Sequence, residues 1–319
     1  MFILNGECAY SMPLKDELNG YLRLPRTFFG IPRPETGDPD VGVIGVPYDM
    51  TSSYMPGPRF APDVIRQATD SERVHSYSLS LARKDIVDIP LTKRITLEDV
   101  GDLEITLRLP EAAVVDISEA CSKLAMRESN LLFLGGDHFI TYPILKGLKR
   151  GRPGRYGLVH LDSHADLHSD MGGYELSHST GVRRMVDEGI LLTDDIAAYD
   201  LRSAIPSHRE EMTGSKAPIS SKKEFHKRVK EIGKQVDFLY LTVDIDVLAP
   251  QIAPGVSHPE SGGLSMVDLV ELLISSFDTG KIRYADVVEL NPMVDPTGIT
   301  SIAARDIVKE ILTGFANHK

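Results

Sequence analysis

The chain has few cysteines, no surplus of basic residues and no long apolar run. Its 319 residues include only two cysteines, Cys8 and Cys121, which excludes a disulfide framework and a cysteine-based zinc site. We therefore expect a protein of the reducing cytoplasm. Lys and Arg number 35 against 46 Asp and Glu, a net charge of −11, whereas binding of nucleic acid needs a basic stripe. We expect neither a nucleic-acid partner nor a membrane, since no stretch approaches the roughly 20 apolar residues of a membrane span and no secretory signal pattern is found.

Apolar runs alternate with helical patterns from residue 41 onward. Strands are predicted over 41–46, 131–134, 156–161, 196–201, 238–243 and 284–289. Helices are predicted near 61, over 111–127, after Pro143, and over 181–188, 224–234, 265–277 and 300–315. Apolar strands that alternate with helices are typical of a parallel sheet covered on both faces. The sequence thus predicts an α/β fold, a single-domain three-layer α/β/α architecture around a central parallel sheet.

Two segments are expected to be irregular. Residues 1–40 contain Pro13, Pro25, Pro32, Pro34 and Pro39, and they are predicted to form an N-terminal arm on the surface or on a neighbouring subunit. The polar stretch over 206–223 has no clear pattern. No Pro/Gly/Ser linker interrupts 41–319, which is therefore predicted to be one catalytic domain.

Acidic and histidine side chains follow three of the predicted strands. Asp162, His164 and Asp166 alternate at the end of the strand over 156–161, and a strand points every second side chain to the same face. Asp244 and Asp246 alternate in the same way after the strand over 238–243. His138 closes the sequence Gly-Gly-Asp-His after the strand over 131–134. Since ligands bind at the carboxyl ends of parallel strands, we expect these side chains to converge there.

Six ligands of this kind indicate a metal centre. Asp and His without Cys suit a hard or borderline divalent metal, Mn²⁺ first, with Ni²⁺, Co²⁺, Zn²⁺ and Fe²⁺ as alternatives. Four converging carboxylates would repel one another unless cations lay among them. Six ligands exceed the needs of one catalytic metal, so we expect two metal ions about 3.5–4 Å apart that lower the pKa of a bridging water. The predicted reaction class is hydrolysis at carbon or phosphorus.

The three motifs resemble the metal signatures of the ureohydrolase (arginase/agmatinase) family. They are Gly135-Gly-Asp-His138, Asp162-Ser-His-Ala-Asp166 and Asp244-Ile-Asp246. The similarity extends from Val41 to Ile311 and includes Gly57-Pro-Arg-Phe-Ala-Pro and Asp286-Val-Val-Glu-Leu-Asn-Pro. The resemblance implies an arginase-like fold, a binuclear manganese hydrolase, a small cationic guanidino substrate and a homo-oligomer, either a trimer or a hexamer.

The resemblance also implies a ligand set. His138, Asp162, Asp166 and Asp244 would hold one metal ion. The second would be held by His164 and Asp246, with Asp162 and Asp244 bridging the two. Asp166 would in addition orient the attacking hydroxide.

Two further residues take catalytic roles by the same resemblance. Glu289 would bind the guanidinium group of the substrate through charge-assisted hydrogen bonds. His178 would protonate the leaving amine, a role that suits a pKa near neutrality. Asp137 is expected to support His138 or to cap a helix, His160 and His168 to have core or rim roles, and His258 is considered for the substrate entrance.

Departures from the family pattern leave the substrate open. The usual Asp-Ala-His reads Asp162-Ser-His, and the usual Gly-Thr-Gly-Thr-Pro loop reads Gly255-Val-Ser-His-Pro. The Gly255 loop resembles formimidoylglutamases, whereas His178 resembles agmatinases and guanidinobutyrases. We expect cleavage of agmatine to putrescine and urea, or of 4-guanidinobutanoate. The alternatives are hydrolysis of N-formimidoyl-glutamate to glutamate and formamide, and a catalytically silent regulatory homologue.

Overall fold

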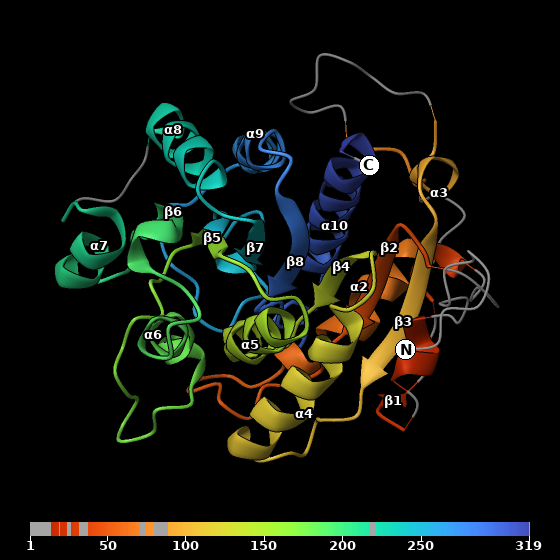
Figure 1. The fold of residues 1–319 in the computed structure, drawn as a ribbon, viewed down its shortest axis with the longest axis horizontal. Helices are drawn as coiled ribbons and strands as arrows, with labels where there is room; N and C mark the ends of the chain where they lie inside the picture. The colour runs from red at the N-terminus through yellow and green to blue at the C-terminus, as the bar shows by residue number, and fades with distance from the viewer. Residues whose placement is uncertain are drawn as a thin grey trace.

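The structure is a computed structural model of the chain, and it describes residues 14–18, 20–23, 27–31, 38–70, 75–79, 89–216 and 221–318. One sheet of eight strands organises these residues (Figure 1). The strands are β1 (Leu22–Arg23), β2 (Val41–Gly45), β3 (Leu97–Leu103), β4 (Asn130–Leu134), β5 (Tyr156–Asp162), β6 (Ile196–Asp200), β7 (Phe238–Asp244) and β8 (Ile282–Val288). Their order across the sheet is β1-β3-β2-β4-β8-β7-β5-β6.

The strands from β2 to β8 pair in parallel, as the sequence predicts. The exception is β1, which pairs antiparallel with β3 at one edge. It belongs to residues 1–40, so the described part of the predicted arm includes a short edge strand. The boundary at residue 40 stays a prediction.

Helices cover both faces of the sheet and form the outer layers of the predicted α/β/α architecture (Figure 1). They are α1 (Leu14–Glu17), α2 (Ala61–Thr69), α3 (Leu91–Arg94), α4 (Pro110–Leu124), α5 (Thr141–Gly151), α6 (Gly181–Asp187), α7 (Pro206–Thr213), α8 (Lys222–Gly233), α9 (Met266–Phe277) and α10 (Ile299–Asn317). No helix of the described ranges combines the length and apolar composition that crossing a membrane requires.

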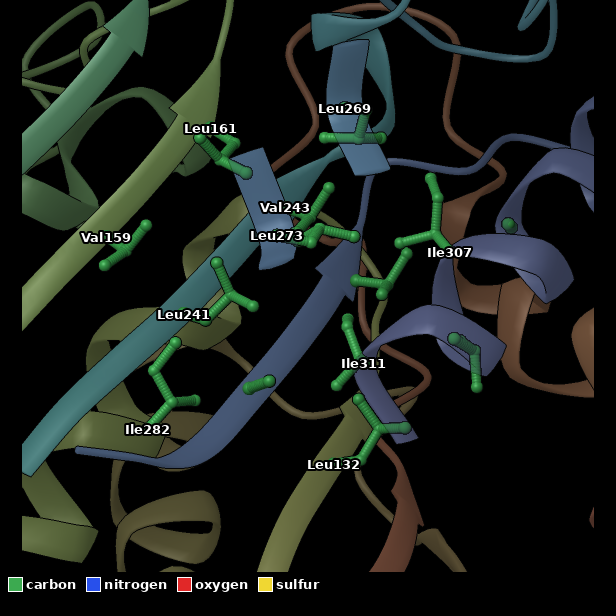
Figure 2. Close-up of a cluster of buried hydrophobic side chains, with 14 of the residues drawn as sticks. Leu132, Val159, Leu161, Leu241, Val243, Leu269, Leu273, Ile282, Ile307 and Ile311 are labelled. Atoms are coloured by element: carbon green, nitrogen blue, oxygen red, sulfur yellow. The ribbon is translucent and has the colours of Figure 1, made fainter. Parts of the chain in front are cut away.

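The strands alternate their side chains between two apolar cores. On β7, Leu241 and Val243 belong to the core under α8, α9 and α10, whereas Tyr240 belongs to the core under α4 and α5. Figure 2 shows the first core, where Leu269 and Leu273 of α9 pack over the β7 side chains. Burial on both faces explains why the central strands are mostly apolar.

Strand β3 is absent from the sequence prediction because it carries three buried carboxylates. Asp99 accepts a hydrogen bond of 2.8 Å from the fully buried Arg66 of α2, which also pairs with Asp102. Glu98 accepts the backbone N–H of Leu14 at 2.8 Å. Buried charges persist when they are paired in this way, so these acids attach α2 and α1 to the sheet.

Two other elements begin or occur where the sequence does not predict them. Helix α5 begins at Thr141, before Pro143, because proline is tolerated in a first helical turn. Helix α7 occupies part of the polar stretch over 206–223, and it buries Met212. Residues 217–220 of that stretch lie outside the described residues.

Candidate metal centre

His138 is the centre of a first group of carboxylates. It follows β4, and its Nδ1 atom lies 3.0 Å from Oδ2 of Asp162, 3.0 Å from Oδ2 of Asp166 and 3.3 Å from Oδ2 of Asp244. The carboxylates come from the end of β5, the loop that follows it and the end of β7, and β8 lies between β7 and β4 in the sheet. The structure therefore brings together the four side chains of the first predicted ligand set.

His164 is the centre of a second group. Its Nδ1 atom lies 2.8 Å from Oδ2 of Asp246 and 3.6 Å from Oδ1 of Asp162. Asp162 thus faces His138 with one oxygen and His164 with the other, the position expected of a bridging carboxylate. Asp244 lies beside Asp246, whose backbone N–H donates to its Oδ1 at 2.8 Å.

The donor atoms of these groups fit metal ions. Nδ1 of His138 and Oδ2 of Asp162 are buried, and neither forms a hydrogen bond with the described residues. Buried polar atoms normally have a partner, and nitrogen and oxygen lone pairs that face one another suit a cation. His164, Asp162 and Asp246 likewise present donor atoms within 4.8 Å of one another. Burial and the charges of Asp246 and Asp162 raise the pKa of Asp244 well above its usual value.

Contacts behind the ligands hold them in place. Nε2 of His138 lies 2.8 Å from the hydroxyl of Thr242, an orientation that leaves Nδ1 free for a metal. The hydroxyl of Ser163 donates to Oδ1 of Asp246 at 2.8 Å. His160 stacks on His138 with ring centroids 5.3 Å apart. Nε2 of His160 lies 3.1 Å from the carbonyl oxygen of His164, which marks Nε2 as a proton donor and not as a ligand.

Two residues of the site have left-handed backbone conformations. Asp166 has a φ of 51° and Glu289 a φ of 65°, values that cost energy for residues other than glycine. The carbonyl of Asp166 accepts the N–H groups of Val182 and Arg183 at the start of α6. The backbone N–H of Glu289 donates to the carbonyl oxygen of Gly136. Oε1 of Glu289 accepts a hydrogen bond of 2.8 Å from the backbone N–H of His138.

His178 and Glu289 form a pair beside the carboxylates. Nδ1 of His178 lies 3.6 Å from Oε1 of Glu289, and Nε2 lies 3.0 Å from the hydroxyl of Ser53. Burial opposes a charge on His178, but the Glu289 carboxylate outweighs burial and raises the pKa of His178 to about 9. Oε2 of Glu289 is buried and has no hydrogen-bond partner among the described residues. The pair thus combines a proton donor with a free carboxylate oxygen.

A cavity of about 160 Å³ opens over these groups. Its lining includes Asp166, Asp244, Asp246 and Glu289, together with His178 and His258. His258 stacks on His178 with ring centroids 5.0 Å apart, and its role at the substrate entrance stays a prediction. A small cationic group can therefore reach both the carboxylates and His178.

Comparison with known proteins identifies the family. The model of the arginase family matches residues 39–314. The chain belongs to the arginase family. Among curated proteins of this kind, an agmatinase from Halalkalibacterium halodurans is 31% identical over 281 residues, which cover 86% of this chain and 91% of that protein. A guanidinobutyrase from Pseudomonas aeruginosa is 32% identical over 284 residues, covering 86% and 85%.

Solved structures of the arginase family have the same fold. Proclavaminate amidino hydrolase from Streptomyces clavuligerus superimposes with a TM-score of 0.77 at 29% identity, over 94% of this chain and 99% of that one. The predicted α/β/α fold and the predicted family are thereby confirmed. The chain belongs to a family of hydrolases that depend on a pair of metal ions and act on C–N bonds of linear amidines.

The sequence motifs do not reveal some of the residues that surround this arginase-family site. Thr242 precedes Asp244 by two residues on β7, so strand parity alone would have placed it near the ligands. Ser53 lies on a loop far from the other site residues in sequence. The carboxylate of Asp137 accepts the N–H and hydroxyl of Thr51 at 3.2 and 2.6 Å. Asp137 is the N-cap residue of the 3-10 helix His138–Ile140, but its side chain forms no capping hydrogen bond there. Asp137 therefore supports the loop that carries Ser53, a role the sequence did not predict.

Proposed function

We propose that this protein hydrolyses a linear guanidino compound to urea and an amine at a binuclear manganese centre. The observation that carries the proposal is the meeting of the two histidine–aspartate groups with the His178–Glu289 pair in one cavity. Agmatine and 4-guanidinobutanoate are the candidate substrates, in line with the names of the curated relatives. A homo-oligomer, trimeric or hexameric, and a cytoplasmic location belong to the same proposal.

The ligand assignment follows the two groups around the histidines. His138, Asp162, Asp166 and Asp244 would hold one metal ion, since three carboxylates lie within 3.3 Å of the His138 ring. His164 and Asp246 would hold the other, together with Asp162 and Asp244. A metal pair of this kind supplies hydroxide at neutral pH by lowering the pKa of bound water.

The other side chains would bind the substrate and move protons. Oε2 of Glu289, which lacks a partner among the described residues, would accept hydrogen bonds from the guanidinium group. Asp166 would accept a hydrogen bond from the attacking water and thereby orient it. His178, which is charged at neutral pH when its pKa is about 9, would donate its proton to the departing amine nitrogen.

The test is product analysis on metal-loaded protein. Urea release is measured with agmatine, 4-guanidinobutanoate, 3-guanidinopropanoate, arginine and guanidine, and formamide release with N-formimidoyl-glutamate. We expect urea from agmatine, 4-guanidinobutanoate or both. Formamide without urea would contradict the proposal and support the formimidoylglutamase alternative. No product from any compound, with two metal ions bound per chain, would support a silent homologue.

A further inference from the structure

Part of the cavity lining belongs neither to the two histidine–aspartate groups nor to the His178–Glu289 pair. We call it the outer wall, and it consists of His168, Met171, Ser179, Ser203, Ile205 and His208. The carboxylates that line the cavity are Asp166, Asp244, Asp246 and Glu289, and each is already assigned to metal or guanidinium. The outer wall therefore presents imidazole and hydroxyl groups but no carboxylate among the described residues.

Three acidic side chains outside the cavity lining contact other groups. Glu211 on α7 forms a 2.8 Å ion pair with Arg183. Asp170 accepts the N–H of Gly173 at 2.9 Å, and Glu260 faces Nε2 of His164 at 3.7 Å. A substrate ammonium group at the outer wall would find no acid assigned to it, so it would give up hydration without forming an ion pair.

His168 and His208 form a pair on this wall. Their rings meet edge to face, with centroids 4.8 Å apart and planes at 77°. His168 follows β5 and is exposed, whereas His208 lies on α7 and is half-buried. Each imidazole offers an N–H donor, and the hydroxyls of Ser179 and Ser203 can donate as well. Donors from separate segments of the chain thus line the same cavity.

We propose that the outer wall binds a carboxylate at the far end of the substrate through His168 and His208. This inference rests on the proposed function, and it selects an ω-guanidino acid over a guanidino amine. A carboxylate accepts hydrogen bonds from several donors at once, and a hydrogen bond to a charged acceptor is stronger than one between neutral groups. Opposite ends of the cavity then recognise opposite charges: Glu289 receives the guanidinium group, and the histidine pair receives the acid.

The test compares three compounds that differ only at the far end: 4-guanidinobutanoate, agmatine and butylguanidine. We expect the metal-loaded protein to have its highest kcat/KM with 4-guanidinobutanoate, by at least about tenfold over agmatine, because a hydrogen bond to a charged group contributes about 1.5–3 kcal/mol. Equal values for the three compounds, or a preference for agmatine, would overturn the inference. Absence of urea from all three would instead count against the proposed function.

Substitutions of His168 and His208 test whether this pair causes the substrate preference. The double variant His168→Ala/His208→Ala should lose at least about tenfold more kcat/KM with 4-guanidinobutanoate than with butylguanidine. His208→Asp should move the preference toward agmatine, since it places a carboxylate on the outer wall. His226→Ala is the matched control, because His226 lies on α8 against the carbonyl of Lys222 and does not line the cavity. Equal losses with all three compounds in the double variant would contradict a role in specificity.

Discussion

The hydroxyl of Thr242 lies 2.8 Å from Nε2 of His138, on the ring nitrogen opposite the one that faces Asp162, Asp166 and Asp244. If Nδ1 binds metal, Nε2 carries the proton and donates it to the Thr242 oxygen. Partners of this kind fix both the tautomer and the orientation of a ligand histidine.

We expect Thr242→Val to weaken metal binding about 10- to 100-fold without changing the fold, because outer partners of metal ligands contribute to affinity on this scale. The measurement is the metal retained during titration with a chelator. Thr242→Ser is the control, since it keeps the hydroxyl and should bind metal like the unmodified protein. An unchanged chelator profile for Thr242→Val would show that the contact does not orient His138.

Replacing a bridging carboxylate should remove metal from the site. Asp162→Asn or Asp244→Asn should abolish urea release and sharply lower the metal content, because each carboxylate lies between the two proposed metal positions. Elemental analysis of the purified protein gives the content per chain. Asp278→Asn, at an exposed position after α9, should keep both metal ions. Two ions per chain in Asp162→Asn would disprove the bridging assignment.

His178 should affect turnover but not metal content. His178→Ala removes the proposed proton donor, and we expect kcat to fall about 10²- to 10⁴-fold, the usual contribution of general acid catalysis. Both metal ions should remain, since His178 contacts Glu289 and Ser53 and lies outside the two ligand groups. Steady-state kinetics on metal-verified protein tests this, and an unchanged kcat would exclude His178 as the donor.

Asp295 should make stability depend on acidic pH. Burial opposes its charge, but hydrogen bonds from Thr297 and Thr300 outweigh burial and lower its pKa from 3.8 to about 2. A carboxyl group with a depressed pKa stabilises the folded state above its unfolded pKa, and the contribution is lost as the pH falls through the folded value. Asp295→Asn should thus reduce the free energy of unfolding by about 1–2 kcal/mol at pH 7.

Urea denaturation of both proteins at several pH values measures this difference. The two stabilities should converge as the pH falls from 3.8 to about 2. A difference that stays constant over this range would mean that Asp295 acts through its shape and not through its charge.

The central part of the fold could be predicted from the sequence because its strands are buried on both faces. The strands β5 and β7 are mostly apolar, and each ends in an aspartate of the candidate site, Asp162 and Asp244. Strand β3 could not be found in this way. Its acids Glu98 and Asp99 look like those of a solvated loop until Arg66 and the N–H groups of α1 are known to neutralise or bind them.

The metal ligands were predictable in the same sense, whereas the contacts around them were not. The motif spacing singled out Asp162, His164 and Asp166, yet only Asp162 belongs to β5, and His164 and Asp166 lie in the loop that follows it. Ser53 and His208 reach the cavity from a loop and from a helix in a polar stretch, where sequence spacing carries no information on direction. Only the three-dimensional arrangement of these segments brings them to the site.

The order of the strands also determines when the metal centre can form. β4 and β5 follow one another as sheet strands along the chain, yet β8 and β7 lie between them in the sheet. His138 and Asp162 are therefore brought together only after the last strand has been inserted between strands that were synthesised earlier. Metal loading must then follow the synthesis of β8, so a bound metal pair would report that β4, β8, β7 and β5 have been assembled side by side.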